Sequence, residues 1–268
     1  MTKPPETQPP FRVSITGIDG AGKDTVTKLT LGLLAQDFNS VVKLGRPAYE
    51  FNQDGERQIF RRTTEGMDKI HQLSDKVHNK NLITGVNALN VMVQTRVLER
   101  NVLAKEPTPD ILVSSRDPRV DPAVYFTYYA PDVFRRNIGI EKRVRTMQQL
   151  TGVTRNLIVL LKVDPNVAVE RIEARIQAER EERLASGQAT ADVMREKWRH
   201  IHENIADLTM LSEGYDVAID ALQDVQPTTV VEINTTELER HQVVDFARLA
   251  ISGAMNHSIT QYEKVSYP

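Results

Sequence analysis

The chain has 268 residues, which is enough for one large α/β domain or two small ones. Its 34 basic and 36 acidic residues nearly cancel, so composition gives no general attraction to nucleic acid or to an anionic membrane, and we expect neither as a partner. The absence of cysteine excludes disulfides, a thiol nucleophile and cysteine metal sites, and it is compatible with a reducing cytoplasm, where we expect the protein to act.

We expect a single domain over residues 11–256. Residues 1–10 contain four prolines and no apolar core, so they are predicted to form a disordered N-terminal tail. Residues 257–268 are predicted to be a C-terminal tail. No segment of the sequence approaches the length of a membrane span.

The first predicted strand, Arg12 to Thr16, leads into Gly-x-x-x-x-Gly-Lys at residues 17–23, and a helix follows. The glycines let the backbone turn tightly and aim N–H groups inward, while Lys23 can reach the terminal phosphates of a nucleotide. The segment 17–23, the phosphate loop, therefore predicts ATP as the cofactor. Its expected contacts are Gly17, Gly20, Ala21, Gly22, Lys23, Asp24 and Thr25.

The residue after the loop lysine departs from the usual pattern. A Ser or Thr is typical there, because its hydroxyl binds Mg²⁺, but this chain has Asp24, with Thr25 next. A carboxylate is a hard oxygen ligand and suits a helix N-terminus. Asp24 is therefore predicted to bind Mg²⁺ directly or through water.

Five β-rich runs alternate with longer helical patterns, which is typical of a central parallel sheet of about five strands with helices on both faces. The predicted strands are Arg12 to Thr16, Val41 to Leu44, Ile111 to Ser114, Leu157 to Val163 and Thr229 to Ile233. Residues 52–84 are polar and periodic enough to predict helix.

The predicted helix from Val86 to Leu103 contains two arginines, Arg96 and Arg100, within a stripe of apolar residues at helical spacing. A guanidinium in such a stripe needs an anionic partner, because an unpaired buried charge is costly. A phosphate group on an acceptor would pair well with Arg96. An internal salt bridge or a side chain that reaches the rim is the alternative.

Ligands of open parallel sheets collect at the carboxyl ends of the strands. Asp110 precedes the predicted strand Ile111 to Ser114, whereas Asp117 follows it, on the edge that carries the phosphate loop. Asp117 is therefore a candidate for holding Mg²⁺ or for accepting a proton, and Arg116 or Arg119 beside it for binding a phosphate. A simple Asp-Pro turn with solvated neighbours is the alternative.

The aromatic segment from Tyr125 to Tyr129 could stack against a base or supply hydroxyls to a sugar. Packing in the core is the more common use of such residues.

Residues 168–206 read as a long, charged helical region with an interruption near Ser186-Gly187. We predict a helical lid over about 171–199, in which Arg175 and its neighbouring arginines could bring positive charge over a transferred phosphoryl group. Interleaved glutamates make a solvated helix with ordinary ion pairs the alternative.

The phosphate loop resembles that of thymidylate kinases and related nucleoside monophosphate kinases. The resemblance extends in patches along the chain and implies a P-loop kinase fold. It implies that Asp19 faces the acceptor nucleotide, that Arg96 holds the acceptor monophosphate, and that Arg46, followed by Pro47, belongs to an acceptor-binding segment. The order Arg116-Asp117-Pro118-Arg119 departs from the Asp-Arg-Tyr motif of that family.

The sequence thus predicts ATP- and Mg²⁺-dependent phosphoryl transfer to a nucleoside monophosphate, with a deoxynucleotide favoured, in a P-loop kinase fold, with a homodimer left open. The expected catalytic residues are Lys23, Asp19, Arg96, Asp117 and Arg175; the expected acceptor-binding residues are Arg46, Arg96, Arg100 and Tyr125; the expected metal ligands are Asp24 and Asp117. A kinase of a nucleoside or another small acceptor, and a non-catalytic nucleotide-binding module, are the alternatives.

Overall fold

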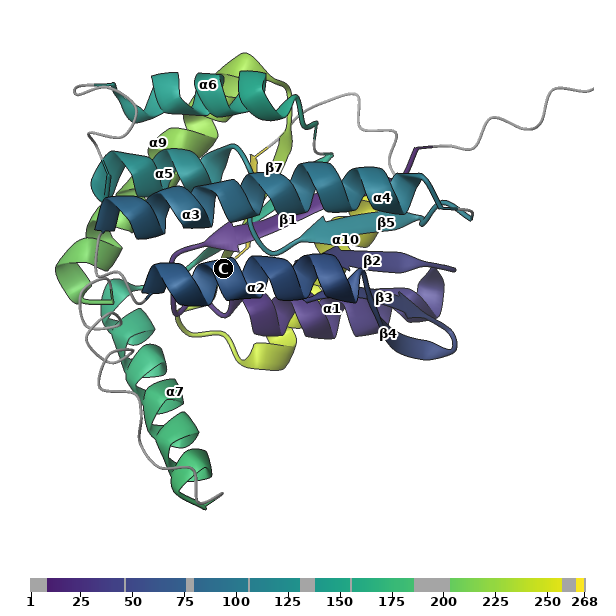
Figure 1. Cartoon of the computed structure of the whole chain (residues 1–268), viewed down its shortest axis with the longest axis horizontal. Coiled ribbons are helices and arrows are strands. Elements are labelled where there is room, and N and C mark those ends of the chain that lie inside the picture. The colour runs from purple at the N-terminus through teal and green to yellow at the C-terminus, as the bar shows by residue number, and fades with distance from the viewer. Residues whose placement is uncertain are drawn as a thin grey trace, which may run out of the picture.

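A computed structural model describes residues 9–45, 47–75, 80–105, 107–130, 138–154, 156–185, 203–256 and 264–267 (Figure 1). Its strands are β1 (Phe11–Gly17), β2 (Val41–Leu44), β3 (Ala48–Asn52), β4 (Gly55–Ile59), β5 (Ile111–Ser114), β6 (Leu157–Lys162), β7 (Thr229–Asn234) and β8 (Lys264–Tyr267). Its helices are α1 (Lys23–Asp37), α2 (Arg61–Asp75), α3 (Lys80–Val93), the π-helical turn η1 (Gln94–Leu98), α4 (Glu99–Leu103), α5 (Val120–Tyr128), α6 (Ile140–Thr151), α7 (Pro165–Ala185), α9 (Ile205–Val225) and α10 (Arg240–Asn256). None of the helices in these ranges is long and apolar enough to cross a membrane.

The strands within the described residues form one sheet of eight, in the order β4-β3-β2-β5-β1-β6-β7-β8. The strands from β2 to β8 in this order are parallel, whereas β3 and β4 form an antiparallel hairpin at one edge. All five predicted strands are present, as β1, β2, β5, β6 and β7. The expectation of about five strands was too low, because β3, β4 and β8 add to them.

The hairpin overturns part of the helix predicted over residues 52–84. In β4 only Ile59 is buried and the four residues before it are exposed, so this edge strand has no apolar alternation that would reveal it in the sequence. Helices α2 and α3 account for the described residues from 61 onward. At the other edge, β8 lies inside the segment 257–268, which was predicted as a tail, and it pairs with β7.

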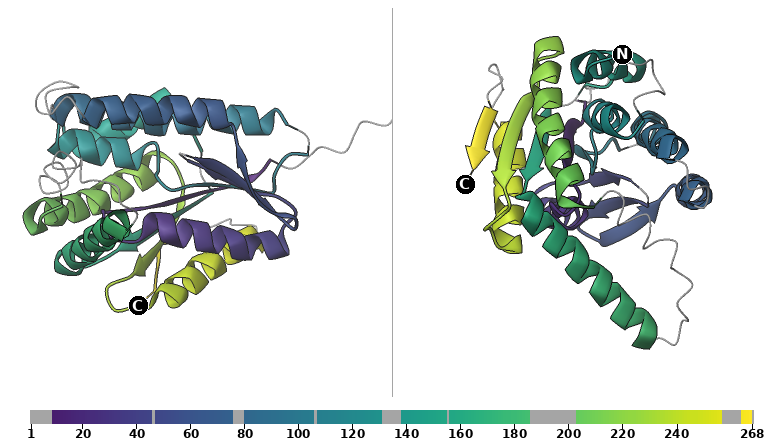
Figure 2. Two further views of the ribbon diagram at one scale, coloured as in Figure 1. Left: turned by 60° about the horizontal axis from the view of Figure 1, so that its bottom comes forward. Right: turned by 90° about the vertical axis from the view of Figure 1, so that its left-hand side faces the viewer.

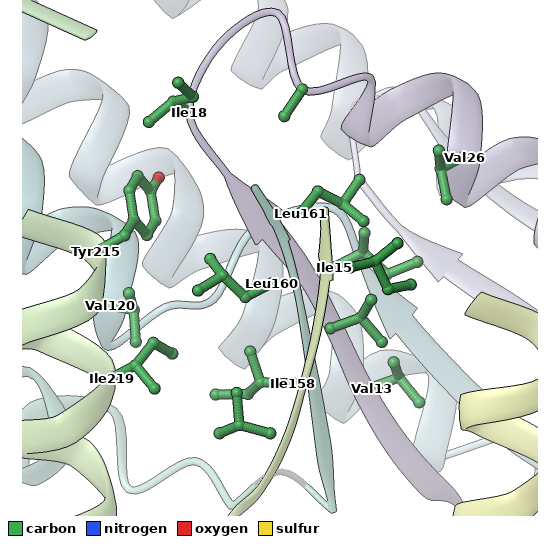
Figure 3. Packing of buried hydrophobic residues seen from close by; sticks show 14 of the residues in the cluster. Val13, Ile15, Ile18, Val26, Val120, Ile158, Leu160, Leu161, Tyr215 and Ile219 are labelled. Carbon is green, nitrogen blue, oxygen red and sulfur yellow. The ribbon is translucent and has the colours of Figure 1, made fainter. Parts of the chain in front are cut away.

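Helices cover both faces of the sheet: α1 and α10 lie on one face, and α3 and α5 on the other (Figure 2). Because both faces are covered, the central strand β6 is a continuous apolar run, and Leu157 to Leu161 are all buried. Figure 3 shows Tyr215 and Ile219 of α9 beside Ile158 and Leu160 of this strand. The core is therefore continuous from the middle of the sheet into the helical layer.

The parallel strands β1, β5, β6 and β7 all end at the same edge of the sheet, because their direction is the same. The segments that follow them, which include the phosphate loop and the turn before α5, therefore meet there. This carboxyl edge holds the candidate site.

Candidate functional site

The phosphate loop has the backbone that its glycines require. Gly17, Gly20 and Gly22 have φ of 143°, 84° and 86°, which favour glycine, and α1 begins at Lys23. A Cβ on Gly20 would lie 2.6 Å from the carbonyl oxygen of Ala168 in α7, and one on Gly17 would collide with a carbonyl of β6. The loop is thus packed closely against β6 and α7. The N–H groups at the start of α1, which have no partner within the helix, face an anion site of the kind that phosphates occupy.

Lys23, the last residue of the phosphate loop, is buried. Its Nζ donates a hydrogen bond to the carbonyl oxygen of Ile18 at 2.8 Å and pairs with Asp19 Oδ1 at 3.2 Å. Only 6% of its surface is exposed. The ammonium group is therefore held at the loop by two oxygens rather than directed into solvent.

Arg116 brings a second cation to the same carboxylate. It follows β5, and its Nη2 lies 3.8 Å from Asp19 Oδ1. Burial by itself raises the pKa of Asp19, but Lys23 and Arg116 outweigh burial and lower this pKa to about 2. Asp19 is thus a carboxylate at neutral pH, and two cations converge on it at the carboxyl edge. This convergence is the electrostatic centre of the candidate site.

A buried carboxylate, Asp121, lies behind Arg116 and was not predicted. Its Oδ2 accepts hydrogen bonds from Thr16 Oγ1 at 2.6 Å and from the backbone N–H of Asp117 at 2.7 Å. Its Oδ1 accepts from the Tyr215 hydroxyl at 2.9 Å and lies 3.4 Å from Arg116 Nη1. Burial raises the pKa of Asp121, and Arg116 acts in the opposite direction. One side chain therefore connects β1, the turn after β5 and α9.

Asp117 does not face the site as predicted. Its Oδ2 accepts from Arg119 Nη2 at 2.9 Å, its Oδ1 accepts from Arg119 Nε at 3.0 Å, and both side chains are fully buried. The same Oδ1 accepts backbone N–H groups of Arg119 and Val120 at the start of α5. Asp117 and Arg119 therefore support the turn into α5. Of the two arginines considered for binding a phosphate, only Arg116 is available to the site, with 35% of its side chain exposed.

Tyr125 lies at the rim of the cluster. Its hydroxyl accepts a hydrogen bond from Arg116 Nη1 at 3.1 Å, and its ring stacks on Tyr129 with the centroids 5.7 Å apart. Burial raises the pKa of Tyr125, and Asp19 raises it further, so the hydroxyl is neutral at physiological pH. The aromatic segment from Tyr125 to Tyr129 thus packs its rings on one another and also contacts the site through the Tyr125 hydroxyl. Stacking of Tyr125 against a base stays a prediction.

Arg96 lies far from the phosphate loop. It is exposed in η1, and its Nε donates to the carbonyl oxygen of Thr151 at the end of α6. One turn later, Glu99 pairs at 2.5 Å with Arg12, which is at the amino end of β1. The phosphate loop follows the other end of that strand, five residues on and so roughly 17 Å away at about 3.3 Å per residue. The structure therefore does not bring Arg96 together with the phosphate loop, and its pairing with an acceptor phosphate stays a prediction.

The apolar stripe that suggested this pairing is only partly buried. Leu89 is 56% exposed and Arg100 is exposed, whereas Met92 and Leu103 are partly buried and pack against the core. The π-helical turn η1 adds a residue to the helix and shifts its phase, which a regular helical spacing cannot anticipate.

Replacing Arg96 by alanine is expected to leave catalytic efficiency within about twofold of the native protein, because the contact of this side chain within the described residues caps the carboxyl end of α6. The loss of stability should be at most about 1 kcal/mol. Steady-state rates and a melting curve check both, with Arg116→Ala as the comparison that should lose activity. A hundredfold loss of catalytic efficiency in Arg96→Ala would contradict this expectation and show that Arg96 takes part in the reaction.

The start of α7 faces the loop. Arg171 donates to the carbonyl oxygen of Thr235 at 2.6 Å and so ties α7 to the segment after β7. Arg175, one turn further, is near enough to contribute to the low pKa of Asp19, and it pairs with Glu203 at 3.2 Å. Of the predicted lid over 171–199, the structure describes residues up to 185, which are helical.

Of the two carboxylates predicted to hold Mg²⁺, Asp117 is bound to Arg119, and Asp24 is the one that lies beside the phosphate loop. Asp24 and Thr25 are exposed in the first turn of α1, beside the loop, where Asp24 could reach a metal bound to phosphates. Within the described residues, no three carboxylates or histidines gather into a metal cluster. Such a site suits Mg²⁺, which usually keeps waters and binds one or two carboxylates together with phosphate oxygens. Arg46, predicted to bind the acceptor, lies outside the described residues.

Replacing Asp24 by asparagine tests its role. If Asp24 binds the metal, the Mg²⁺ concentration for half-maximal activity should rise about tenfold or more, while ATP affinity without metal should increase because a negative charge near the phosphates is lost. Magnesium titrations and calorimetry with ATP measure the two effects. An unchanged magnesium dependence would contradict the assignment.

The similarity of this chain to known proteins is a similarity of fold. No protein-family model and no curated protein matches the chain. Among solved structures it is similar to the deoxyadenosine kinase from M. mycoides, which was determined with its products dCMP and a flexible dCDP bound. The identity is 12%, the TM-score is 0.51, and the match covers 92% of this chain and 99% of the other.

The fold of this chain is that of a P-loop kinase. The predicted fold class is thereby confirmed, with more strands than expected. In this P-loop kinase fold, Lys23, Arg116 and the start of α7 lie at the carboxyl edge, whereas Arg96 and Arg100 lie toward the opposite edge.

Proposed function

We propose that the protein transfers the terminal phosphoryl group of ATP to a nucleoside or a nucleoside monophosphate. The observation that supports this best is the convergence of Lys23 and Arg116 on Asp19 Oδ1, at 3.2 and 3.8 Å, directly beside a glycine-rich phosphate loop. Phosphoryl transfer needs positive charge at the transferred group and an acceptor beside it. A loop that only bound a nucleotide would not require the second cation.

The protein's own groups supply position and charge. The N–H groups of the phosphate loop and the Lys23 ammonium bind the donor phosphates, and Arg116 and Arg175 stabilise the negative charge of the transferred group. Asp24 is the side chain that would hold Mg²⁺, which when bound neutralises the phosphate oxygens. The acceptor oxygen attacks the terminal phosphorus as the bond to the ADP oxygen breaks, so no covalent intermediate with the protein forms.

Two acceptors remain within this proposal. A monophosphate is supported by Arg116, since its partly exposed guanidinium could pair with an acceptor phosphate. A nucleoside is supported by the position of Arg96, which bonds to the end of α6 away from the loop, and by the name of the similar deoxyadenosine kinase. We favour the nucleoside, because the end of the Arg116 guanidinium that faces the site is assigned to the transferred phosphoryl group, which leaves it no free end for an acceptor phosphate.

The test is ADP release from ATP and Mg²⁺ against a panel of nucleosides and their monophosphates. Turnover that depends on nucleosides supports the favoured acceptor, and turnover that depends on monophosphates replaces it by the original prediction. ATP binding without turnover on any member of the panel would contradict the proposed function and would favour a nucleotide-binding module.

A further inference from the structure

Arg116 is held more closely at one end of its guanidinium than at the other. Its Nη1 donates to the Tyr125 hydroxyl at 3.1 Å and lies 3.4 Å from Asp121 Oδ1, while its Nη2 faces Asp19 and the phosphate loop. One end of the guanidinium is thus fixed inside the protein and the other is presented to the site. The direction of Arg116 therefore depends on the position of the Asp121 carboxylate.

The position of Asp121 depends in turn on α9. Tyr215 is 1% exposed, and its hydroxyl donates to Asp121 Oδ1, the same oxygen that faces Arg116. This contact joins residues 94 positions apart in the sequence. Figure 3 shows Tyr215 on α9, on the side of the loop residue Ile18. Burial and the neighbouring Asp121 raise the pKa of Tyr215, so its hydroxyl stays a donor at physiological pH.

We propose that Asp121 and Tyr215 are positioning residues that fix Arg116 toward the terminal phosphate of ATP, an inference that rests on the proposed function of this site. Both side chains are buried, and Arg116 lies between Asp121 and the phosphate loop. Thr16 and the Asp117 amide hold the other carboxylate oxygen, so Tyr215 is the side chain whose removal frees Oδ1 with the least change to the turn.

The decisive variant is Tyr215→Phe, which removes one hydroxyl and keeps the buried ring. It should weaken ATP binding about threefold and lower turnover about tenfold, since a small displacement of a positioned charge is costly in the transition state. Tyr128→Phe is the matched control, because Tyr128 lies against Gly214 next to Tyr215 and, among the hydrogen bonds of the described residues, shares none with Arg116 or Asp121. It should leave both quantities unchanged. Melting curves confirm that the variants are folded.

A double-mutant cycle with Arg116→Ala separates positioning from general structural support. If Tyr215 acts through Arg116, Tyr215→Phe should have no further effect on ATP affinity or turnover once Arg116 is alanine. An equal loss in both backgrounds, or no loss in the native one, would overturn the inference.

ATP affinity is measured by calorimetry and requires no acceptor, so the two proposals fail separately. If the protein has no turnover on the panel but Tyr215→Phe weakens ATP binding only when Arg116 is present, the proposed function is refuted and the positioning role is supported. If the protein is an active kinase but Tyr215→Phe has the same effect with and without Arg116, the positioning role is refuted and the proposed function stands.

Discussion

Replacing Lys23 by alanine is expected to lower phosphoryl transfer by a factor of at least about 10² to 10³, the range found when one preorganised donor to a developing charge is removed. Lys23 Nζ is held at the phosphate loop by the carbonyl of Ile18 and by Asp19, so the variant loses a charge at a fixed position. Rates of ADP release with the best acceptor of the panel, together with ATP affinity, measure the loss.

Lys28→Ala is the matched control for this experiment. Lys28 lies on the same helix, is 61% exposed, and pairs with Glu56 at 3.4 Å away from the loop. The same substitution there should leave rate and affinity unchanged. Turnover retained by Lys23→Ala at the native level would show that the phosphate loop does not bind the donor.

The second large effect is expected in stability, at the buried Asp117–Arg119 pair. Arg119→Ala leaves the fully buried Asp117 carboxylate without its two guanidinium bonds, and this should lower the free energy of unfolding by about 3–5 kcal/mol. The start of α5 should loosen with it, because Asp117 also accepts backbone N–H groups there. Denaturant unfolding measures the change.

An exposed ion pair provides the comparison. Arg57 pairs with Glu50 at 2.5 Å but is 72% exposed, so Arg57→Ala should cost less than about 1 kcal/mol. Replacing both members of the buried pair, as in Asp117→Asn with Arg119→Met, should cost less than Arg119→Ala alone, because no unpaired charge is left inside. Equal losses for Arg119→Ala and Arg57→Ala would mean that the buried pair does not support α5.

The parts of the fold that the sequence predicted well are local. The phosphate loop is a short pattern in which each glycine has a backbone reason, and β6 is an uninterrupted apolar run, so neither depends on distant residues. The strand β4 was missed because an edge strand needs only one buried residue, Ile59, and its exposed residues are polar.

The parts of the site that the sequence could not predict depend on distant residues or on a change of helical phase. Asp117 and Asp121 both follow β5 and precede a proline, and no local signal says which one reaches Arg116. Tyr215 joins the site from α9 and has no motif around it. Arg96 seemed to interrupt a buried stripe because regular spacing was assumed through a π-helical turn.

The base of α7 is held from three directions, and this limits how the helix can move. Gly20 packs against Ala168, Ile172 is buried in the core, and Arg171 bonds to the chain after β7. Beyond these turns, α7 extends away from the sheet and the helices that cover it (Figures 1 and 2). Because its first turns are held at these three places, we expect the rest of α7 to change direction by bending of the helix rather than by rotation of the whole helix.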